Sequence, residues 1–271
     1  MSSAEQVGPS FVKGHGTEND FVLVPDPRGE FELTAERARL ICDRRAGIGA
    51  DGVIRVTPGQ DGRYFMDYRN ADGSLAEMCG NGARVFARFL VDAGWTPAGR
   101  IEFDTRGGVR TADLDVTGDV RIGMGPVTLG GASSAVVAGR ELSGRAADVG
   151  NPHLVCLIDG DPAELDLREA PGYDAAAFPH GVNIEFVRPD GPDAVTMRVY
   201  ERGSGETCSC GTGTVAAAAV HLAAQGLSEG TVAVTVPGGR VQVRVGADGA
   251  DLTGPAVLVY SGTLNPAVLA G

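Results

Sequence analysis

Residues 78–83 read Met-Cys-Gly-Asn-Gly-Ala and residues 209–214 read Ser-Cys-Gly-Thr-Gly-Thr, so a Cys-Gly-x-Gly turn occurs twice, 131 positions apart. Two further matches at this spacing, within one residue, are Gly107-Gly108 with Gly238-Gly239 and Asn19 with Asn151. Matches in the same order along two halves of a chain are hard to obtain by chance, even with 41 glycines. The repeat therefore predicts two similar domains that arose by duplication.

Most of each half is typical of short β-strands separated by turn residues. The clearest strand runs are Phe21–Val24, Val53–Val56, Ile101–Asp104, Val182–Val187, Val195–Tyr200, Val232–Val236 and Val241–Val245. Thr34 can cap a helix that runs to about Arg45, and one helix follows each Cys-Gly-x-Gly turn, ending near Gly94 and near Gly226. We expect an α+β fold of two pseudo-symmetric, strand-rich domains, each a mixed β-sheet or barrel around a central helix.

The repeat also sets the expected domain boundaries. The first domain should span residues 1–128, and the second should span residues 129–263. Residues 264–271 are expected to return to the first domain and complete it as a final strand.

The composition limits the possible functions. The chain has 271 residues with 35 acidic and 23 basic side chains, and a net charge of −12 argues against nucleic acid or a membrane surface as partner. The first residues lack the basic and apolar regions of a secretion signal, and no apolar stretch is long enough to span a bilayer. Five cysteines, an odd number, do not suggest a disulfide framework. We expect a cytoplasmic protein with reduced thiols.

Cys79 and Cys210 each lie at the start of a predicted helix. The first N–H groups of a helix lack internal partners, and the helix dipole favours negative charge there, which lowers the pKa of a thiol. The neighbouring glycines allow backbone N–H groups to approach an anionic ligand such as a carboxylate. Inversion of a carbon centre by proton transfer needs two such groups, because one removes a proton and the other delivers a proton to the opposite face.

The remaining cysteines have simpler interpretations. Cys42 falls in a predicted helix and Cys156 in an apolar strand, so we expect both in the core. Cys208 lies two residues before Cys210, but no Cys-x-x-Cys pair or histidine-rich set accompanies it. We therefore expect no metal site.

Around these residues the sequence resembles the diaminopimelate epimerase family, whose members are cofactor-independent and interconvert LL- and meso-diaminopimelate. The resemblance covers almost the whole chain. It rests on Asn19-Asp20-Phe21, Gly47-Ile-Gly-Ala-Asp-Gly52, Arg69-Asn70-x-Asp72-Gly73, Met78-Cys-Gly-Asn-Gly-Ala-Arg84, Gly150-Asn-Pro-His153, Val182-Asn183, Glu201-Arg202-Gly203-x-Gly205-Glu206-Thr207 and Cys210-Gly-Thr-Gly213. It implies two domains of like topology with the substrate in the cleft between them, no cofactor, and a homodimer.

The resemblance also implies roles for individual residues. The catalytic residues would be Cys79 and Cys210 as the acid/base pair, with His153 and Glu201 beside them. The substrate-binding residues would be Asn19, Asn70, Gly80, Asn81, Asn151, Asn183, Glu201, Arg202, Gly211 and Thr212. Among these, the residues after each cysteine would bind the α-carboxylate through backbone N–H groups. The other asparagines would hold amino and carboxylate groups, and Glu201 and Arg202 would meet the distal ammonium and carboxylate.

One position departs from the family pattern, and three other functions agree less well with the motifs. Gly52 stands where many members carry a glutamine that contacts substrate, which puts one substrate hydrogen bond in doubt. A proline or hydroxyproline racemase of the same architecture would not need Glu201-Arg202 and several asparagines. An amino-acid-binding relative that has lost catalysis would not need both cysteines, and related phenazine-type isomerases lack the pair. The motifs favour an epimerase of lysine and peptidoglycan-precursor biosynthesis.

Overall fold

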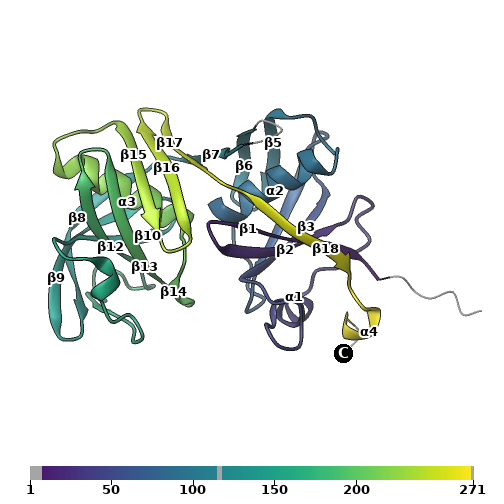
Figure 1. The fold of residues 1–271 in the computed structure, drawn as a ribbon, viewed down its shortest axis with the longest axis horizontal. Coiled ribbons are helices and arrows are strands. Elements are labelled where there is room, and N and C mark those ends of the chain that lie inside the picture. Colours follow the sequence, from purple (N-terminus) through teal and green to yellow (C-terminus); the bar gives the residue numbers. More distant parts are fainter. Residues whose placement is uncertain (1–7, 115–117, 270–271) are drawn as a thin grey trace, which may run out of the picture. The chain divides into compact units, whose positions relative to one another are not determined.

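The computed structural model describes residues 8–114 and 118–269, and its contacts divide the chain into two compact units. The described part of unit 1 comprises residues 8–16, 20–114, 118–120 and 256–269, whereas unit 2 comprises Thr17–Asn19 and Arg121–Pro255. Each unit is a curved sheet around one long helix, α2 (Gly80–Asp92) in unit 1 and α3 (Gly211–Ala224) in unit 2 (Figure 1).

The sheet of unit 1 is mixed, and its strands pair in the order β18–β1–β2–β3–β4–β5–β6. These strands are β1 (Ser10–Gly16), β2 (Asn19–Pro25), β3 (Gly52–Pro58), β4 (Tyr64–Asn70), β5 (Gly99–Thr105), β6 (Gly108–Leu114) and β18 (Val257–Thr263). The pairs β2–β3 and β4–β5 are parallel, and β1–β18, β3–β4 and β5–β6 are antiparallel. Helix α1 (Ala35–Cys42) connects β2 to β3, and the Thr34 hydroxyl caps it by accepting from the Arg37 N–H at 3.2 Å.

Unit 2 repeats this order of strands. The strands that correspond in sequence to β1–β6 are β9 (Arg140–Asp148), β10 (Pro152–Leu157), β12 (Asn183–Gly191), β13 (Ala194–Glu201), β15 (Gly230–Val236) and β16 (Gly239–Gly246). The pairs β10–β12 and β13–β15 are parallel, as in unit 1, and β8 (Thr128–Val137) pairs with β9 where β18 pairs with β1. The remaining elements are β7 (Val120–Gly125), η1 (Pro162–Glu164), β11 (Gly172–Tyr173), β14 (Gly205–Thr207), β17 (Gly249–Gly254) and α4 (Pro266–Leu269).

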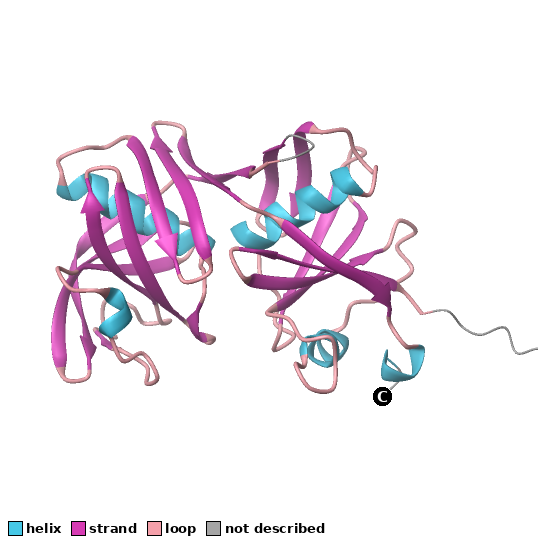
Figure 2. Ribbon diagram, viewed as in Figure 1, coloured by secondary structure: helices cyan, strands magenta, loops and turns pink. Residues whose placement is uncertain are grey.

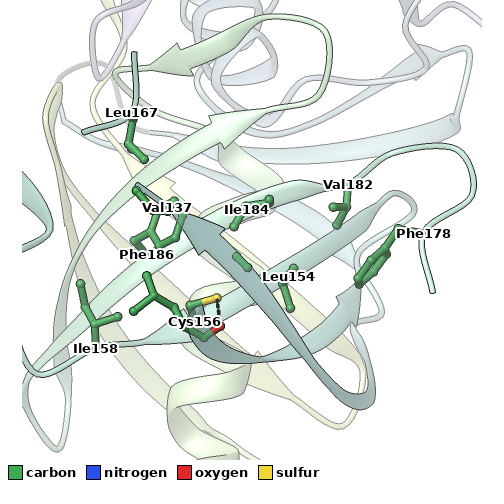
Figure 3. Packing of buried hydrophobic residues seen from close by; sticks show 11 residues of the cluster. Val137, Leu154, Cys156, Ile158, Leu167, Phe178, Val182, Ile184 and Phe186 are labelled. Carbon is green, nitrogen blue, oxygen red and sulfur yellow. Dashed lines mark hydrogen bonds between the residues drawn. The ribbon is translucent and has the colours of Figure 1, made fainter. Parts of the chain in front are cut away.

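The predicted fold class is confirmed, because strands dominate both units and each carries one prominent helix (Figure 2). The α2 helix buries Val85, Phe86 and Leu90 completely, and the alanine-rich α3 helix buries Ala216–Ala218. Apolar side chains of β10 and β12, such as Leu154, pack together in the core of unit 2, with Cys156 among them (Figure 3). Cys42 and Cys156 are both buried, as predicted.

Over residues 264–269 the end of the chain differs from the prediction of a final strand, while residues 270–271 of that prediction lie outside the described residues. The strand that joins unit 1 is β18, and residues 266–269 form the short α4 helix. Pro266 lacks the N–H group that a strand ladder needs, which explains why pairing ends before it. The chain passes from unit 1 to unit 2 between Val120 and Arg121 and returns to unit 1 between Pro255 and Ala256. The repeat boundaries after 128 and 263 stay predictions from the sequence. No helix in residues 8–114 and 118–269 is long and apolar enough to cross a membrane.

Candidate active site

Cys79 is the N-cap residue of α2 in unit 1. Its backbone is extended, with φ of −129°, and its Sγ atom accepts a hydrogen bond from the Gly82 N–H at 3.5 Å. Gly80 and Asn81, the first two helical residues, therefore present backbone N–H groups in the first turn, where a helix has no internal acceptors for them. The thiol is half-buried, so this helix start combines a partly accessible sulfur with helix N–H donors.

A buried arginine lies one turn further along α2. Arg84 is 0% exposed, and its Nη1 atom donates to the Oδ1 atom of Asn81 at 2.9 Å. Burial lowers the pKa of Arg84 to about 10, while the charges of Cys79 and Asp119 oppose this shift. Electrostatic coupling is mutual, so the Arg84 guanidinium favours a thiolate at Cys79.

Asn70, at the end of β4, is held by two neighbours. Its Oδ1 atom accepts from the Tyr68 hydroxyl at 2.7 Å, and its Nδ2 atom donates to the Ser74 hydroxyl at 3.0 Å. Asn70 also pairs in register with Gly52 of β3. A Cβ atom at Gly52 would lie only 2.4 Å from the Tyr68 ring, so the tyrosine occupies the space that a larger residue 52 would need.

Cys210 is the N-cap residue of α3 in unit 2 and has the same geometry as Cys79. Its φ is −121°, and its Sγ atom accepts from the Gly213 N–H at 3.4 Å, with the Thr212 hydroxyl 3.5 Å away. Gly211 is the first helical residue and is buried. Unlike Cys79, Cys210 is only 6% exposed. Burial raises the pKa of the Cys210 thiol well above its ordinary value, and the negative charges of Glu201 and Glu185 add to the effect.

Glu201 ends β13 beside Cys210. Its Oε1 atom accepts a short hydrogen bond from the Thr207 hydroxyl, and its carboxyl group is also hydrogen-bonded to Cys210. Burial raises the pKa of Glu201, because the ionised carboxylate loses hydration, while the two hydrogen bonds act in the opposite direction. A protonated carboxyl group and a protonated thiol therefore both become more favourable here than in water.

His153 lies on β10 between two oxygen-bearing side chains. Its Nδ1 atom is 2.7 Å from Oε1 of Glu185 on β12, and its Nε2 atom is 3.0 Å from Oδ1 of Asn151. The side chains of His153 and Glu185 are both completely buried. These contacts fix the imidazole plane and join Asn151 to the interior of the unit.

Asn183 and Arg202 contact each other at the start of β12 and the end of β13. The Arg202 backbone N–H donates to Oδ1 of Asn183 at 2.9 Å, and the Arg202 Nη1 atom donates to the His180 carbonyl at 2.8 Å. The aliphatic part of Arg202 packs on Gly181, whose φ is +81° and where a Cβ atom would lie 2.7 Å from Cδ of Arg202. Arg202 is exposed, so its guanidinium can reach a ligand.

Asn19 begins β2 directly after a tight turn. Thr17 and Glu18 form that turn with φ of +52° and +61°, which is uncommon for residues other than glycine. The Thr17 hydroxyl donates to the Ser209 hydroxyl at 2.8 Å, next to Cys210. Thr17–Asn19 belong by their contacts to unit 2.

The structure thus brings several of the predicted residues of unit 2 into contact, whereas in unit 1 Asn70 contacts Tyr68 and Ser74 and Asn81 contacts Arg84. In unit 2 Asn151 touches His153, Glu201 touches Cys210, and Asn183 touches Arg202. Three residues of these sites were missed in the sequence, namely Tyr68, Arg84 and Glu185. Glu185 had a recognisable signal, because it is a lone acidic residue in the apolar strand run Val182–Val187.

Solved structures show which fold this is. A PhzF-family phenazine biosynthesis protein from Bacillus anthracis matches with a TM-score of 0.68 at 17% identity, over 94% of this chain and 98% of that one. A hydroxyproline epimerase from Agrobacterium vitis matches with a TM-score of 0.67 at 14% identity, over 96% and 94% of the two chains. This chain therefore has the two-unit, strand-rich fold that these two proteins share.

Sequence comparisons identify the family. The diaminopimelate epimerase family model matches residues 11–130 and 145–262. A curated diaminopimelate epimerase from Corynebacterium glutamicum is 49% identical, over 94% of this chain and 98% of the relative. Another, from Thermobifida fusca, is 47% identical, over 96% and 99%. The chain belongs to the diaminopimelate epimerase family and is an isomerase.

Proposed function

We propose that this protein interconverts LL-2,6-diaminopimelate and meso-2,6-diaminopimelate by two-base proton transfer at the α-carbon, in lysine and peptidoglycan-precursor biosynthesis. The observation that carries the proposal is the pair of equivalent helix starts, each capped by a cysteine whose sulfur accepts the third N–H of its helix. The names of relatives at 47–49% identity over nearly the whole chain support the choice of substrate.

The proposed reaction moves one proton at each thiol. In one direction the Cys79 thiolate takes the α-proton and becomes a thiol, and the electron pair of the broken C–H bond spreads onto the α-carboxylate. The Cys210 thiol then gives its proton to the opposite face of the carbon and becomes a thiolate. The reverse direction exchanges these roles. The helix N–H groups after Cys79 and Cys210 stabilise the charge that develops on the carboxylate.

The other predicted residues would bind the two amino-acid heads of the substrate. Backbone N–H groups of Gly80-Asn81 and Gly211-Thr212 would bind the α-carboxylate. The amide groups of Asn19, Asn70, Asn151 and Asn183 would hold amino and carboxylate groups. Arg202 would pair with the distal carboxylate, and Glu201 would meet the distal ammonium group as well as assist Cys210, with His153 supporting the catalytic centre.

We further propose that the enzyme works as a homodimer in the cytoplasm. Three large apolar side chains on β18, Val257, Val259 and Tyr260, are 43%, 55% and 49% exposed, and such a group on one strand is typical of an interaction surface. A mechanism that needs both thiols reduced suits a reducing compartment. Light scattering of a Val259→Lys variant tests the dimer, and an unchanged mass would remove β18 from the interface.

The reaction itself is tested by incubating the protein with LL-diaminopimelate in D2O and following the α-proton by NMR. Loss of the α-proton signal together with formation of the meso isomer is expected. L-Proline and trans-4-hydroxy-L-proline serve as parallel substrates and should keep their α-protons. No deuterium uptake with any diaminopimelate isomer would defeat the proposal.

A further inference from the structure

The two units differ in the pair of side chains that lies under the cysteine-capped helix. The register of β2 on β3 matches that of β10 on β12, so Phe21 corresponds to His153 and Ile54 to Glu185. In unit 1 the pair is apolar, and in unit 2 it is a histidine and a carboxylate 2.7 Å apart. Unit 2 thus has two buried ionisable side chains near Cys210, and unit 1 has apolar side chains at the corresponding positions near Cys79.

The third residue of each helix shows how close these pairs lie to the helix start. A Cβ atom at Gly82 would contact the side-chain carbons of Ile54 and Phe21 at 3.2 and 3.3 Å. A Cβ atom at Gly213 would lie 2.6 Å from Oε1 of Glu185 and 3.2 Å from Cβ of Cys210. The Glu185 carboxylate therefore packs against the first turn of α3, which Cys210 caps.

Burial of the Glu185 side chain is energetically unfavourable. The side chain is 0% exposed, and its Oε2 atom has no hydrogen-bond partner among the described residues. A buried carboxylate whose desolvation is only partly compensated does little for stability, and an apolar pair fills the same position in unit 1. Such a group fits a role at the neighbouring reactive residue better than a role in packing.

The charged and titratable groups around Cys210 come from three strands. Glu201 at the end of β13 is hydrogen-bonded to the thiol, and Glu185 from β12 lies under the same helix turn. His153 from β10 contacts Glu185 on the side of Nδ1. On α3 itself, the Sγ atom of Cys210 accepts from the Gly213 N–H and lies 3.5 Å from the Thr212 hydroxyl. A negative charge on Glu185, or on Glu201 when it is ionised, therefore opposes a negative charge on Cys210, and helix N–H groups favour it.

We propose that Glu185 is a positioning residue that holds Cys210 in its protonated thiol form, so that Cys210 begins a turnover as proton donor and Cys79 as base. The role of Glu185 in turnover rests on the proposed function, because only a reaction that uses two thiols needs one of them as a thiol and the other as a thiolate. Its effect on the protonation of Cys210 does not depend on any substrate. Arg84 favours a thiolate at Cys79, so the charged groups of the two units favour opposite protonation states at the two cysteines.

The test is the pH dependence of alkylation by iodoacetamide, followed separately at Cys210 and Cys79 by peptide mass spectrometry from about pH 6 to about pH 10. In the Glu185→Gln variant the pH midpoint for Cys210 should fall by about one unit, and that for Cys79 should stay in place. At a fixed pH below both midpoints, this shift raises the alkylation rate of Cys210 about tenfold. Glu206→Gln is the matched control, because it removes the charge of an exposed carboxylate paired with Arg198.

A structural role alone would alter the exposure of Cys210 and hence its maximal rate, but not its midpoint. Should Glu185→Gln fail to fold, the double variant His153→Phe/Glu185→Ile installs the unit 1 pair and should also lower the midpoint. An unchanged midpoint in a folded variant would overturn the proposal. Because no substrate is present, this outcome is independent of whether the protein epimerises diaminopimelate.

Discussion

Tyr68 fills the space beside Gly52 and orients Asn70. A Cβ atom at position 52 would lie 2.4 Å from the Tyr68 ring and 2.7 Å from the Arg69 carbonyl oxygen, so glycine is required by packing. The Tyr68 hydroxyl donates to Oδ1 of Asn70, which leaves the amide NH2 group of Asn70 as the donor toward its surroundings. Residue 52 has no side chain, and the Tyr68 ring fills the space beside it. The Tyr68 hydroxyl in turn orients the side chain of Asn70.

Tyr68→Phe should weaken substrate binding without unfolding the protein. It removes one hydrogen bond, worth about 0.5–1.5 kcal/mol, and so frees the Asn70 amide to rotate. KM for diaminopimelate should rise about three- to tenfold, measured by a coupled assay, with kcat changed less than about twofold. Tyr64→Phe on the same strand is the control, since its ring packs on Trp95. Equal KM values for the two variants would leave Tyr68 with a packing role only.

The residues that the sequence missed share one property. Tyr68, Arg84 and Glu185 each make a contact that a sequence motif does not display, such as Tyr68 against Gly52 and Glu185 against His153, in both cases across neighbouring strands. A motif shows which side chains follow one another, but not which side chain lies beneath a helix. The position of each cysteine at a helix start could be predicted, because the Cys-Gly-x-Gly turn and the helical pattern after it are local in the sequence.

At the scale of elements, the two helix starts have one backbone design in different surroundings. Both caps are extended, and both sulfurs accept the N–H of the third helical residue, Gly82 or Gly213. Thiols replace the hydroxyl or carboxylate groups that usually cap helices. The glycine at the third position has different surroundings in the two units, since Gly82 faces apolar side-chain carbons and Gly213 faces a carboxylate oxygen.

Replacing these two glycines by alanine should therefore give unequal results. Alanine in a helix is favoured over glycine by about 1 kcal/mol. At Gly82 the nearest atoms are ends of side chains at 3.1–3.3 Å, so Gly82→Ala should change stability by less than about 1 kcal/mol. At Gly213 the oxygen of buried Glu185 is only 2.6 Å away, and Gly213→Ala should cost about 1–3 kcal/mol. Urea unfolding of both variants is the measurement, and equal losses would contradict the argument.

The start of β2 is held by an ion cluster. Asp20 contacts Lys13 Nζ at 2.6 Å and Arg44 Nη2 at 2.8 Å, and its Oδ1 atom accepts from the Asp51 N–H at 2.9 Å. Burial alone would raise the pKa of Asp20, but hydrogen bonds and charge from Arg44 and Lys13 lower it to about 2. The cluster thus fixes the strand that begins at Asn19.

This cluster should make stability depend on pH in the acid range. The folded pKa of Asp20 lies below its ordinary value of 3.8, so its contribution is present above that value and is lost as pH falls toward about 2. The contribution at neutral pH is about 2 kcal/mol. Asp20→Asn should lose it, and the variant should approach the wild type when urea unfolding is measured at about pH 2 instead of about pH 6. A constant difference between the two proteins would show that Asp20 acts by shape and not by charge.

Strands and helices could be predicted where a local pattern decides them. Six of the seven predicted apolar runs lie within strands, the seventh (Val182–Val187) starts one residue before β12, and Thr34 caps α1 as predicted. The end of the chain was not, because residues 264–269 continue an apolar pattern while Pro266 interrupts the strand ladder. The pattern of apolar residues does not show that Pro266 lacks the backbone N–H group that a strand ladder needs.

At the scale of the whole molecule, one strand order is used twice with different charge. Unit 1 places buried Arg84 near Cys79, and unit 2 places Glu185 and Glu201 near Cys210. The repeated motif predicted the duplicated fold, since backbone pattern follows the spacing of glycines and apolar residues. It did not predict the electrostatic difference, which arises at positions where the two halves no longer match. A pair of thiols in opposite protonation states is what an inversion reaction needs.

Cys79→Ala and Cys210→Ala test this division of labour. Each variant should lose inversion, because no group remains to deliver the opposite proton. The remaining thiol can still remove and return a proton on its own face, so any residual exchange of the α-proton with D2O should occur from one configuration only. The two variants should prefer opposite configurations, with Cys210→Ala acting on the LL form through Cys79 and Cys79→Ala on the meso form. NMR of each isomer in D2O measures this exchange.

The outcome separates a two-base reaction from a one-base reaction, with the double variant Cys79→Ala/Cys210→Ala as the background. A single base that serves both faces would leave one variant inactive and the other still able to epimerise. Sustained epimerisation by either single variant, above the double variant, would therefore overturn the two-base mechanism even if diaminopimelate is the substrate. Exchange from opposite configurations in the two variants would place one thiol on each face of the α-carbon, as one catalytic cysteine per repeat requires.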